Sequence, residues 1–190
     1  MSYAPLDPTK TLVLFADLQA GILERTGTQP VASLTRAVGA LAQLAALFDM
    51  PAVVTTAPVE GGVAVTPEIE AALGVLAPHT RTCTDAFLDK ATAEALTGAG
   101  RPTLLIAGVA TEIIVQHSAL SGLSRGFEVQ VVIDACGGIS PRTEDAALRR
   151  MAAAGVVTTS IASLAGQLAG DFSQGKGGQA LGVLYAMAGG

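Results

Sequence analysis

Short, uninterrupted runs of apolar residues, separated by helical patterns, constrain this chain more than any other feature of its sequence. Five runs are typical of buried strands, and they cover residues 11–16, 52–56, 103–108, 128–133 and 156–159. A weaker strand is expected near Thr80. A strand that is apolar at every position is buried on both faces, which is typical of a parallel sheet with helices above and below it. We therefore predict a three-layer α/β/α fold around a doubly wound, mainly parallel sheet of about six strands.

The segments between these runs have the periodicity of amphipathic helices. Residues 31–48 place apolar side chains three and four positions apart, so that they share one face. The helix expected over residues 140–154 has Ser140 as its N-cap and Gly155 just beyond its end. A last, apolar helix is expected at about residues 179–187. Helices and strands therefore alternate along the chain, as the predicted fold requires.

Length and composition limit the class of protein. A chain of 190 residues that is 50% hydrophobic suits one domain with a sizeable core, so we predict a single domain over residues 1–190 with a C-terminal extension from about residue 170. The net charge of -5 disfavours nucleic acid and anionic lipid as partners. No apolar run reaches the roughly 20 residues of a membrane-spanning helix. Because only two cysteines and no export signal are visible, we expect a cytoplasmic protein without membrane contact.

The residues that follow the strands are the candidates for a site, because ligands of doubly wound sheets bind beyond the carboxyl ends of the strands. Asp17 follows the first strand, where its carboxylate suits a general acid or base, or alternatively the N-cap of the next helix. Arg81 follows the weak strand. Beside Asp17 it would lower the pKa of that carboxyl; otherwise it is a solvated arginine. The helix that begins at Thr111 presents unpaired backbone N–H groups, which suit an anion or oxyanion.

The sequence shows no evident nucleophile, metal site or cofactor motif. Cys83 and Cys136 lie near strand ends, but a lone cysteine in apolar surroundings is usually a small buried hydrophobe, so a cysteine nucleophile is only an alternative. The only histidines, His79 and His117, lack the spacing of metal ligands, and we predict no metal. The first strand is not followed by a dinucleotide fingerprint, and no P-loop occurs. We therefore predict no cofactor.

Three separate segments resemble the isochorismatase-like cysteine hydrolases. Leu-Val-Leu-Phe-Ala-Asp-Leu-Gln-Ala-Gly at residues 12–21 is similar to the opening strand and Asp-x-Gln of that family. Gly-Val-Ala-Thr-Glu-Ile-Ile-Val at residues 108–115 resembles the family's Gly-Val-x-Thr-x-x-Cys-Val, and residues 126–135 resemble its Gly-(aromatic)-x-Val and Asp-Ala segment. The likeness spans residue 12 to about 163 and is strongest to the YcaC-like branch. The fold of this family is a doubly wound sheet, which the apolar runs predict independently.

The resemblance implies a catalytic triad of Asp, Lys and a nucleophilic Cys. In this chain Asp17 matches the aspartate, and Arg81 takes the place of the lysine. Ile114 occupies the position of the cysteine, and its side chain has no nucleophilic atom. The groups implied to bind an oxyanion or the substrate belong to Val109, Ala110, Ile114 and Gln19.

Two functions are compatible with these residues. Family members named for isochorismate hydrolysis act without the cysteine, because a vinyl ether is cleaved by protonation and water attack. We therefore expect a family hydrolase of a small amide, imide or vinyl ether that lacks the usual cysteine. The alternative is a catalytically silent binding or assembly module, since Ile114 replaces the nucleophile. In both cases the resemblance implies a homo-oligomer that assembles through its C-terminal region.

Overall fold

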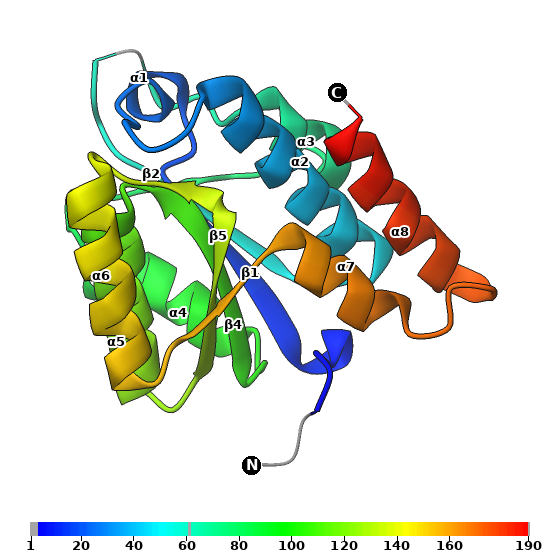
Figure 1. Cartoon of the computed structure of the whole chain (residues 1–190). Helices are drawn as coiled ribbons and strands as arrows, with labels where there is room; N and C mark the ends of the chain where they lie inside the picture. Colours follow the sequence, from blue (N-terminus) through cyan, green and yellow to red (C-terminus); the bar gives the residue numbers. More distant parts are fainter. Residues whose placement is uncertain (1–3, 61, 190) are drawn as a thin grey trace.

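The computed structural model describes residues 4–60 and 62–189 of the chain. Within these residues, six strands form one parallel sheet in the order β3-β2-β1-β4-β5-β6 (Figure 1). The strands are β1 (Thr11–Ala16), β2 (Ala52–Thr56), β3 (His79–Thr80), β4 (Thr103–Val109), β5 (Glu128–Gly137) and β6 (Val157–Thr159). The predicted doubly wound α/β fold is therefore confirmed, including the weak strand near Thr80.

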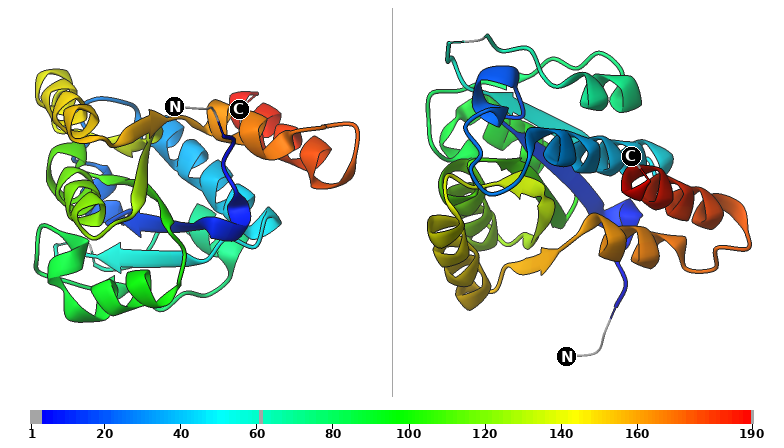
Figure 2. Two further views of the ribbon diagram at one scale, coloured as in Figure 1. Left: turned by 90° about the horizontal axis from the view of Figure 1, so that it is seen from below. Right: turned by 45° about the horizontal axis from the view of Figure 1, so that its top comes forward.

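Helices cover both faces of the sheet, as Figures 1 and 2 show. One face packs against α2 (Val31–Leu47), α3 (Pro67–Leu73), α7 (Ile161–Ala169) and α8 (Gly175–Ala188). The other face packs against α4 (Lys90–Gly98), α5 (Gln116–Ser124) and α6 (Pro141–Ala154). The shorter helical segments are η1 (Pro8–Lys10), α1 (Ala20–Leu23), η2 (Ala86–Leu88) and η3 (Thr111–Val115). None of the helices in the described part of the chain is long and apolar enough to cross a membrane.

The central strand β1 explains why the strands are apolar throughout. Successive side chains of a strand point to opposite faces of the sheet. Val13 and Phe15 accordingly pack into the core beneath α2, whereas Leu12 and Leu14 pack into the core on the opposite face. All four side chains are fully buried. Both faces of β1 are therefore buried, one in each core. For this reason apolar and polar residues do not alternate along the strand, as they do in a sheet with one exposed face.

The two ends of α6 are set by residues that cap helices. Ser140 caps α6, since its hydroxyl accepts a hydrogen bond from the backbone N–H of Thr143 at 3.3 Å. Gly155 ends the same helix with φ 106°, a left-handed conformation that glycine adopts without steric cost. Both ends of this helix are therefore as predicted.

The last helix is longer than the sequence indicates. We expected it to begin near residue 179, but α8 begins at Gly175. A Cβ atom at Gly177 would lie 2.4 Å from the carbonyl oxygen of Ala169, so this glycine allows the first turn of α8 to pack closely on the end of α7. Gly177 therefore permits close packing between two helices and is not part of a loop.

Candidate active site

The candidate site lies beyond the carboxyl ends of β1 and β4. The connection after β1 leads to α2 on one face of the sheet, and the connection after β4 leads to α5 on the other face. Such a reversal opens a crevice between two neighbouring strands. A cavity of about 400 Å³ occupies this crevice, at the lower end of the range for small-molecule sites. The predicted site residues that line it are Asp17, Arg81, Val109, Ala110 and Ile114.

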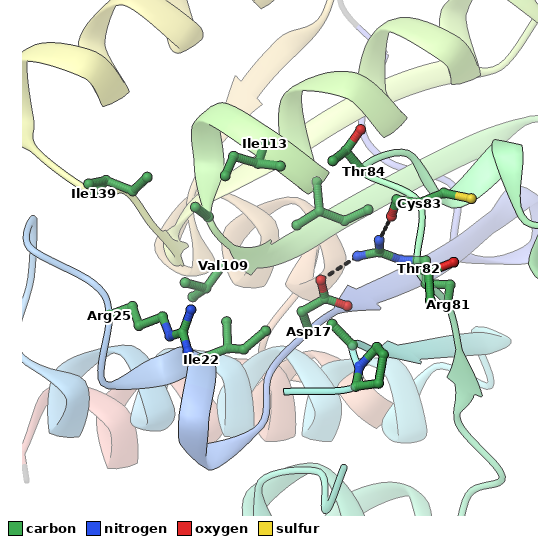
Figure 3. Close-up of a pocket in the computed structure, with 14 residues that line it drawn as sticks. Asp17, Ile22, Arg25, Arg81, Thr82, Cys83, Thr84, Val109, Ile113 and Ile139 are labelled. Carbon is green, nitrogen blue, oxygen red and sulfur yellow. Dashed lines mark hydrogen bonds and ion pairs between the residues drawn. The ribbon is translucent and has the colours of Figure 1, made fainter. Parts of the chain in front are cut away.

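Asp17 follows β1 directly, with its backbone in the left-handed region at φ 58°. Aspartate is one of the few residues besides glycine that adopts this conformation readily. Its backbone N–H donates to the carbonyl oxygen of Thr55 at 3.0 Å, and its carboxylate faces Arg81 in the cavity (Figure 3). The alternative role as an N-cap is wrong, because α1 begins after Gln19 and receives no side-chain cap.

Asp17 and Arg81 form a buried ion pair. A terminal nitrogen of Arg81 contacts Oδ2 of Asp17, and the hydroxyl of Thr55 donates to Oδ1 at 3.0 Å. The side chains of Arg81 and Asp17 are only 3% and 7% exposed. The second terminal nitrogen of Arg81 donates to the carbonyl oxygen of Cys83. Arg81 is therefore fixed at both ends of its guanidinium group, and the alternative of a solvated surface arginine is wrong.

Burial decides the acidity of Asp17. The sequence led us to expect that Arg81 lowers the pKa of this carboxyl. In the structure, loss of water around the carboxylate raises its pKa, and this effect outweighs the lowering by the charge of Arg81 and the hydrogen bond from Thr55. Arg81 therefore acts on the pKa in the expected direction, but a net lowering was wrong because the expectation left out the desolvation of Asp17. A raised pKa suits a carboxyl group that exchanges protons with a substrate.

The segment that follows β4 forms the apolar wall of the cavity. Ile114 lies in η3, is 1% exposed, and packs into the core on the face of α5. Val109, Ala110 and Ile113 line the same wall. The backbone N–H of Ile113 donates to the carbonyl oxygen of Ala110 at 3.1 Å, which removes this amide from the candidate oxyanion groups. The side chain of Ile114 takes up part of the space at this wall, but a cavity of about 400 Å³ remains.

The side chain of Gln19 contacts the backbone of the loop that follows β2. The side chain is fully buried, and its Nε2 donates to the carbonyl oxygens of Ala57 and Gly62 at 2.8 and 2.6 Å. Its Oε1 accepts from the backbone N–H of Ala57 at 2.7 Å. With both amide donors occupied, Gln19 holds the loop in place. We assign it this positioning role instead of the expected contact with substrate.

The two cysteines have different surroundings. Cys136 is fully buried in β5, and burial raises the pKa of its thiol to about 12, so it is protonated and unreactive at neutral pH. This finding overturns the alternative that Cys136 is the nucleophile. Cys83 is partly exposed and lines the cavity, but its sulfur points away from Asp17 in Figure 3.

Arg25 is the site residue that the sequence analysis missed. It follows α1, and its Nε donates to the carbonyl oxygen of Gly21 at 2.9 Å. The guanidinium group lines the cavity on the side away from Arg81 (Figure 3). A single helical turn leaves too short a pattern in the sequence to show which way its side chains point.

The histidines do not come together in a metal site. His79 lies in β3 and His117 in α5. Across residues 4–60 and 62–189, no three His, Cys, Asp or Glu side chains are close enough to hold a metal ion. That the protein uses neither a metal nor another cofactor stays a prediction.

Comparison with known proteins identifies the family. The Isochorismatase domain family matches residues 11–163, a range that contains all the strands described above. The chain belongs to this isochorismatase family. The matched range contains Asp17, Arg81 and the η3 wall of the cavity, so the region that carries the likeness also carries the site.

The relatives of this isochorismatase-family protein include YcaC proteins. The protein of Escherichia coli (strain K12) named "Probable hydrolase YcaC" is 33% identical over 155 residues, which cover 80% of this chain and 74% of the relative. The structure of YcaC from Pseudomonas aeruginosa "with hexane-2,5-diol and covalent acrylamide" has a TM-score of 0.88 and 33% identity, and the match covers 100% of this chain and 96% of that one.

The E. coli YcaC structure, described as "an octameric hydrolase of unknown specificity", has a TM-score of 0.87 and 30% identity over 98% of this chain and 90% of that one. The resemblance to the YcaC-like branch is confirmed. These comparisons place the chain among isochorismatase-family hydrolases and leave its substrate open.

Proposed function

We propose that this protein hydrolyses a small amide, imide or vinyl ether, with Asp17 as general acid–base and water as the nucleophile. The observation that carries the proposal is a buried carboxyl group of raised pKa on the wall of an open cavity. The resemblance to the family motif implies that Ile114 takes the place of the nucleophilic cysteine, and isoleucine offers no atom for attack. Hydrolysis therefore proceeds without an acyl-enzyme.

For an amide, water adds to the carbonyl carbon while Asp17 accepts one proton from that water. The electron pair of the carbonyl bond moves to oxygen, where the backbone N–H groups of Ala110 and Ile114, which line the cavity, stabilise the charge. The carbonyl then re-forms, the C–N bond breaks, and Asp17 returns its proton to the leaving nitrogen. The products are a carboxylic acid and ammonia or an amine. Arginine keeps its proton in such a cycle, so Arg81 acts as a fixed positive charge.

For a vinyl ether, protonated Asp17 acts first as the acid. It transfers its proton to the alkene carbon, and water adds to the oxygen-stabilised cation that results. The proton lost by the water returns to Asp17, and the hemiketal breaks to a carbonyl compound and an alcohol. The raised pKa of Asp17 favours this route, because it increases the protonated fraction at a given pH.

A catalytically silent binding protein is the second candidate. Both oxygens of Asp17 already accept hydrogen bonds, from Thr55 and Arg81, and Ile114 takes up space beside them. In this case the carboxylate of Asp17 has a structural role: it holds Thr55 and Arg81 in place at the crevice and exchanges no proton with a ligand. The cavity then binds a ligand without transforming it.

A screen of small amides, imides and vinyl ethers separates the two candidates. The wild-type protein should hydrolyse at least one compound, and the same compound should survive incubation with Asp17→Ala. Equal hydrolysis by both proteins would exclude Asp17 as the catalytic group. An absence of hydrolysis across the whole panel would favour the silent binding protein.

We also propose that the chain forms a homo-oligomer through its C-terminal extension. The octameric E. coli YcaC supports self-association. In this chain α8 packs on α2 and α7, but Phe172 and Tyr185 stay 65% and 68% exposed. Large apolar side chains left on the surface suit a contact between subunits.

Sedimentation analysis of the full chain should accordingly give a mass several times that of one chain. Phe172→Ser with Tyr185→Ser should shift the distribution to smaller species, because the subunit contact loses its apolar anchors. Leu88→Ser is the matched control, since Leu88 is 66% exposed and lies in η2, whose neighbouring residues pack on the opposite face of the sheet. A wild-type protein that sediments as a monomer contradicts the proposal.

A further inference from the structure

The cavity contains one positive charge that no acidic side chain balances. Asp17 is the only acidic residue among the described residues that line the cavity, and it is paired with Arg81. Arg25 lines the opposite side and forms no ion pair with any described residue. The cavity is thus positive overall, although the whole chain has a net charge of -5. Such a local field attracts an anion.

The guanidinium group of Arg25 is oriented for a ligand. Its Nε is held by the carbonyl oxygen of Gly21 at 2.9 Å, so the two terminal nitrogens are left for another acceptor. Figure 3 shows this group directed into the space beside Val109. A partly fixed arginine loses less conformational entropy when it binds an anion than a free surface arginine does.

The wall between Arg25 and the Asp17–Arg81 pair is apolar. Ile22, Val109 and Ile113 line this part of the cavity. Hydrocarbon binds such a wall well, whereas a sugar or nucleotide would leave its polar groups without partners. Thr82 and Thr84, the hydroxyl-bearing residues among the described residues that line the cavity, lie on the Arg81 side, so the lining offers no hydroxyl group beside Arg25 to help bind a phosphate (Figure 3).

We infer that Arg25 binds the carboxylate of a small substrate whose apolar body spans the cavity and whose hydrolysable carbonyl or enol ether lies at Asp17. This inference rests on the proposed hydrolysis for the position of the reacting bond, but not for the binding of the anion. A guanidinium group and a carboxylate form two parallel hydrogen bonds, which fix both distance and orientation. Arg25 is in this way the specificity-determining residue, and Asp17 is the catalytic one.

Two matched ketones test the binding without any turnover. The probe 5-oxohexanoate carries a carboxylate and a carbonyl at opposite ends of a short chain, and hexan-2-one lacks the carboxylate. Neither contains a bond that the proposed chemistry can hydrolyse. Calorimetric titration of the wild-type protein should show that 5-oxohexanoate binds about 10-fold or more tightly than hexan-2-one, as expected for one charge-assisted bidentate contact. Added salt should reduce this preference.

Substitutions show whether the preference belongs to Arg25. Arg25→Gln should abolish it, whereas Arg36→Gln should retain it, because Arg36 is an exposed residue of α2 that changes the net charge equally without lining the cavity. Both variants should keep the melting temperature of the wild type, since both side chains are exposed. Equal affinities for the two ketones in the wild type, or an unchanged preference in Arg25→Gln, would overturn the inference.

The inference and the proposed function fail in different ways. A carboxylate preference that Arg25→Gln removes, together with no hydrolysis in the screen, supports the anion site and contradicts the catalytic role. Hydrolysis that depends on Asp17 but is equally fast for substrates with and without a carboxylate supports the catalytic role and contradicts the anion site.

Discussion

Replacing Asp17 by Asn should lower kcat/KM for the best substrate by about 10²- to 10⁴-fold, the usual contribution of a general acid or base. Asparagine preserves the size of the side chain and an acceptor for the hydroxyl of Thr55, but it neither takes nor gives a proton. Steady-state kinetics of the purified variant measure the loss. Asp145→Asn is the matched control, because Asp145 makes the same kind of ion pair on the exposed surface of α6. A rate that survives in Asp17→Asn contradicts the assignment.

The pH dependence of the wild-type rate indicates which proton transfer limits it. Because burial raises the pKa of Asp17, its titration should appear above the ordinary carboxyl range. With an amide substrate, Asp17 acts first as a base, and kcat/KM should fall as the pH drops through this pKa. With a vinyl ether, Asp17 acts as an acid, and kcat/KM should fall as the pH rises through it.

The second large effect concerns stability. Arg81→Met should lower the free energy of unfolding by about 3–5 kcal/mol, because it leaves the buried Asp17 carboxylate without its partner. Urea denaturation at neutral pH measures this change. Asp17→Asn combined with Arg81→Met should cost less than the sum of the single changes, since no unpaired charge is then left in the core.

An exposed ion pair provides the comparison for this result. Arg149 and Asp145 approach to 2.6 Å, but their side chains are 79% and 56% exposed. Arg149→Met should therefore change the free energy of unfolding by no more than about 1 kcal/mol. If Arg81→Met were equally mild, the buried pair would not stabilise the site.

Acid should partly rescue the Arg81→Met variant. Burial raises the folded-state pKa of Asp17, and removing Arg81 takes away the main effect that opposes this rise. The folded state then holds the proton more tightly than the unfolded state, whose pKa is about 3.9. The free energy of unfolding therefore falls as the pH rises from the unfolded-state pKa to the folded-state pKa, and is constant above it. A deficit relative to the wild type that is the same at all pH values would contradict this explanation.

The location of the site could be predicted because it depends on topology. Continuous apolar runs define buried parallel strands, and the carboxyl ends of such strands meet at one edge of the sheet. Asp17, Arg81 and Ile114 are far apart in the sequence, yet all three line one cavity. Residue type and position after a strand were sufficient to predict Asp17 and Arg81, whereas Ile114 was predicted from the resemblance to the family motif.

The properties that depend on burial and on side-chain direction could not be predicted. The pKa of Asp17 is set by desolvation, which is a property of the packed core and not of the neighbouring residues in the sequence. The amide of Gln19 is turned toward the loop after β2 by hydrogen bonds to main-chain atoms 38 and 43 positions away. Arg25 follows a helix of one turn, whose orientation only the tertiary structure defines.

The most direct test of the central claim, that Asp17 drives hydrolysis without a cysteine nucleophile, is the activity of Cys83→Ala with Cys136→Ala. Because the chain has only two cysteines, this variant contains none. Its kcat/KM on the best substrate, measured beside that of the wild type, should be unchanged within the error of the assay. A fall of about 100-fold or more, the scale of losing a catalytic group, would show that a thiol takes part and would contradict the mechanism.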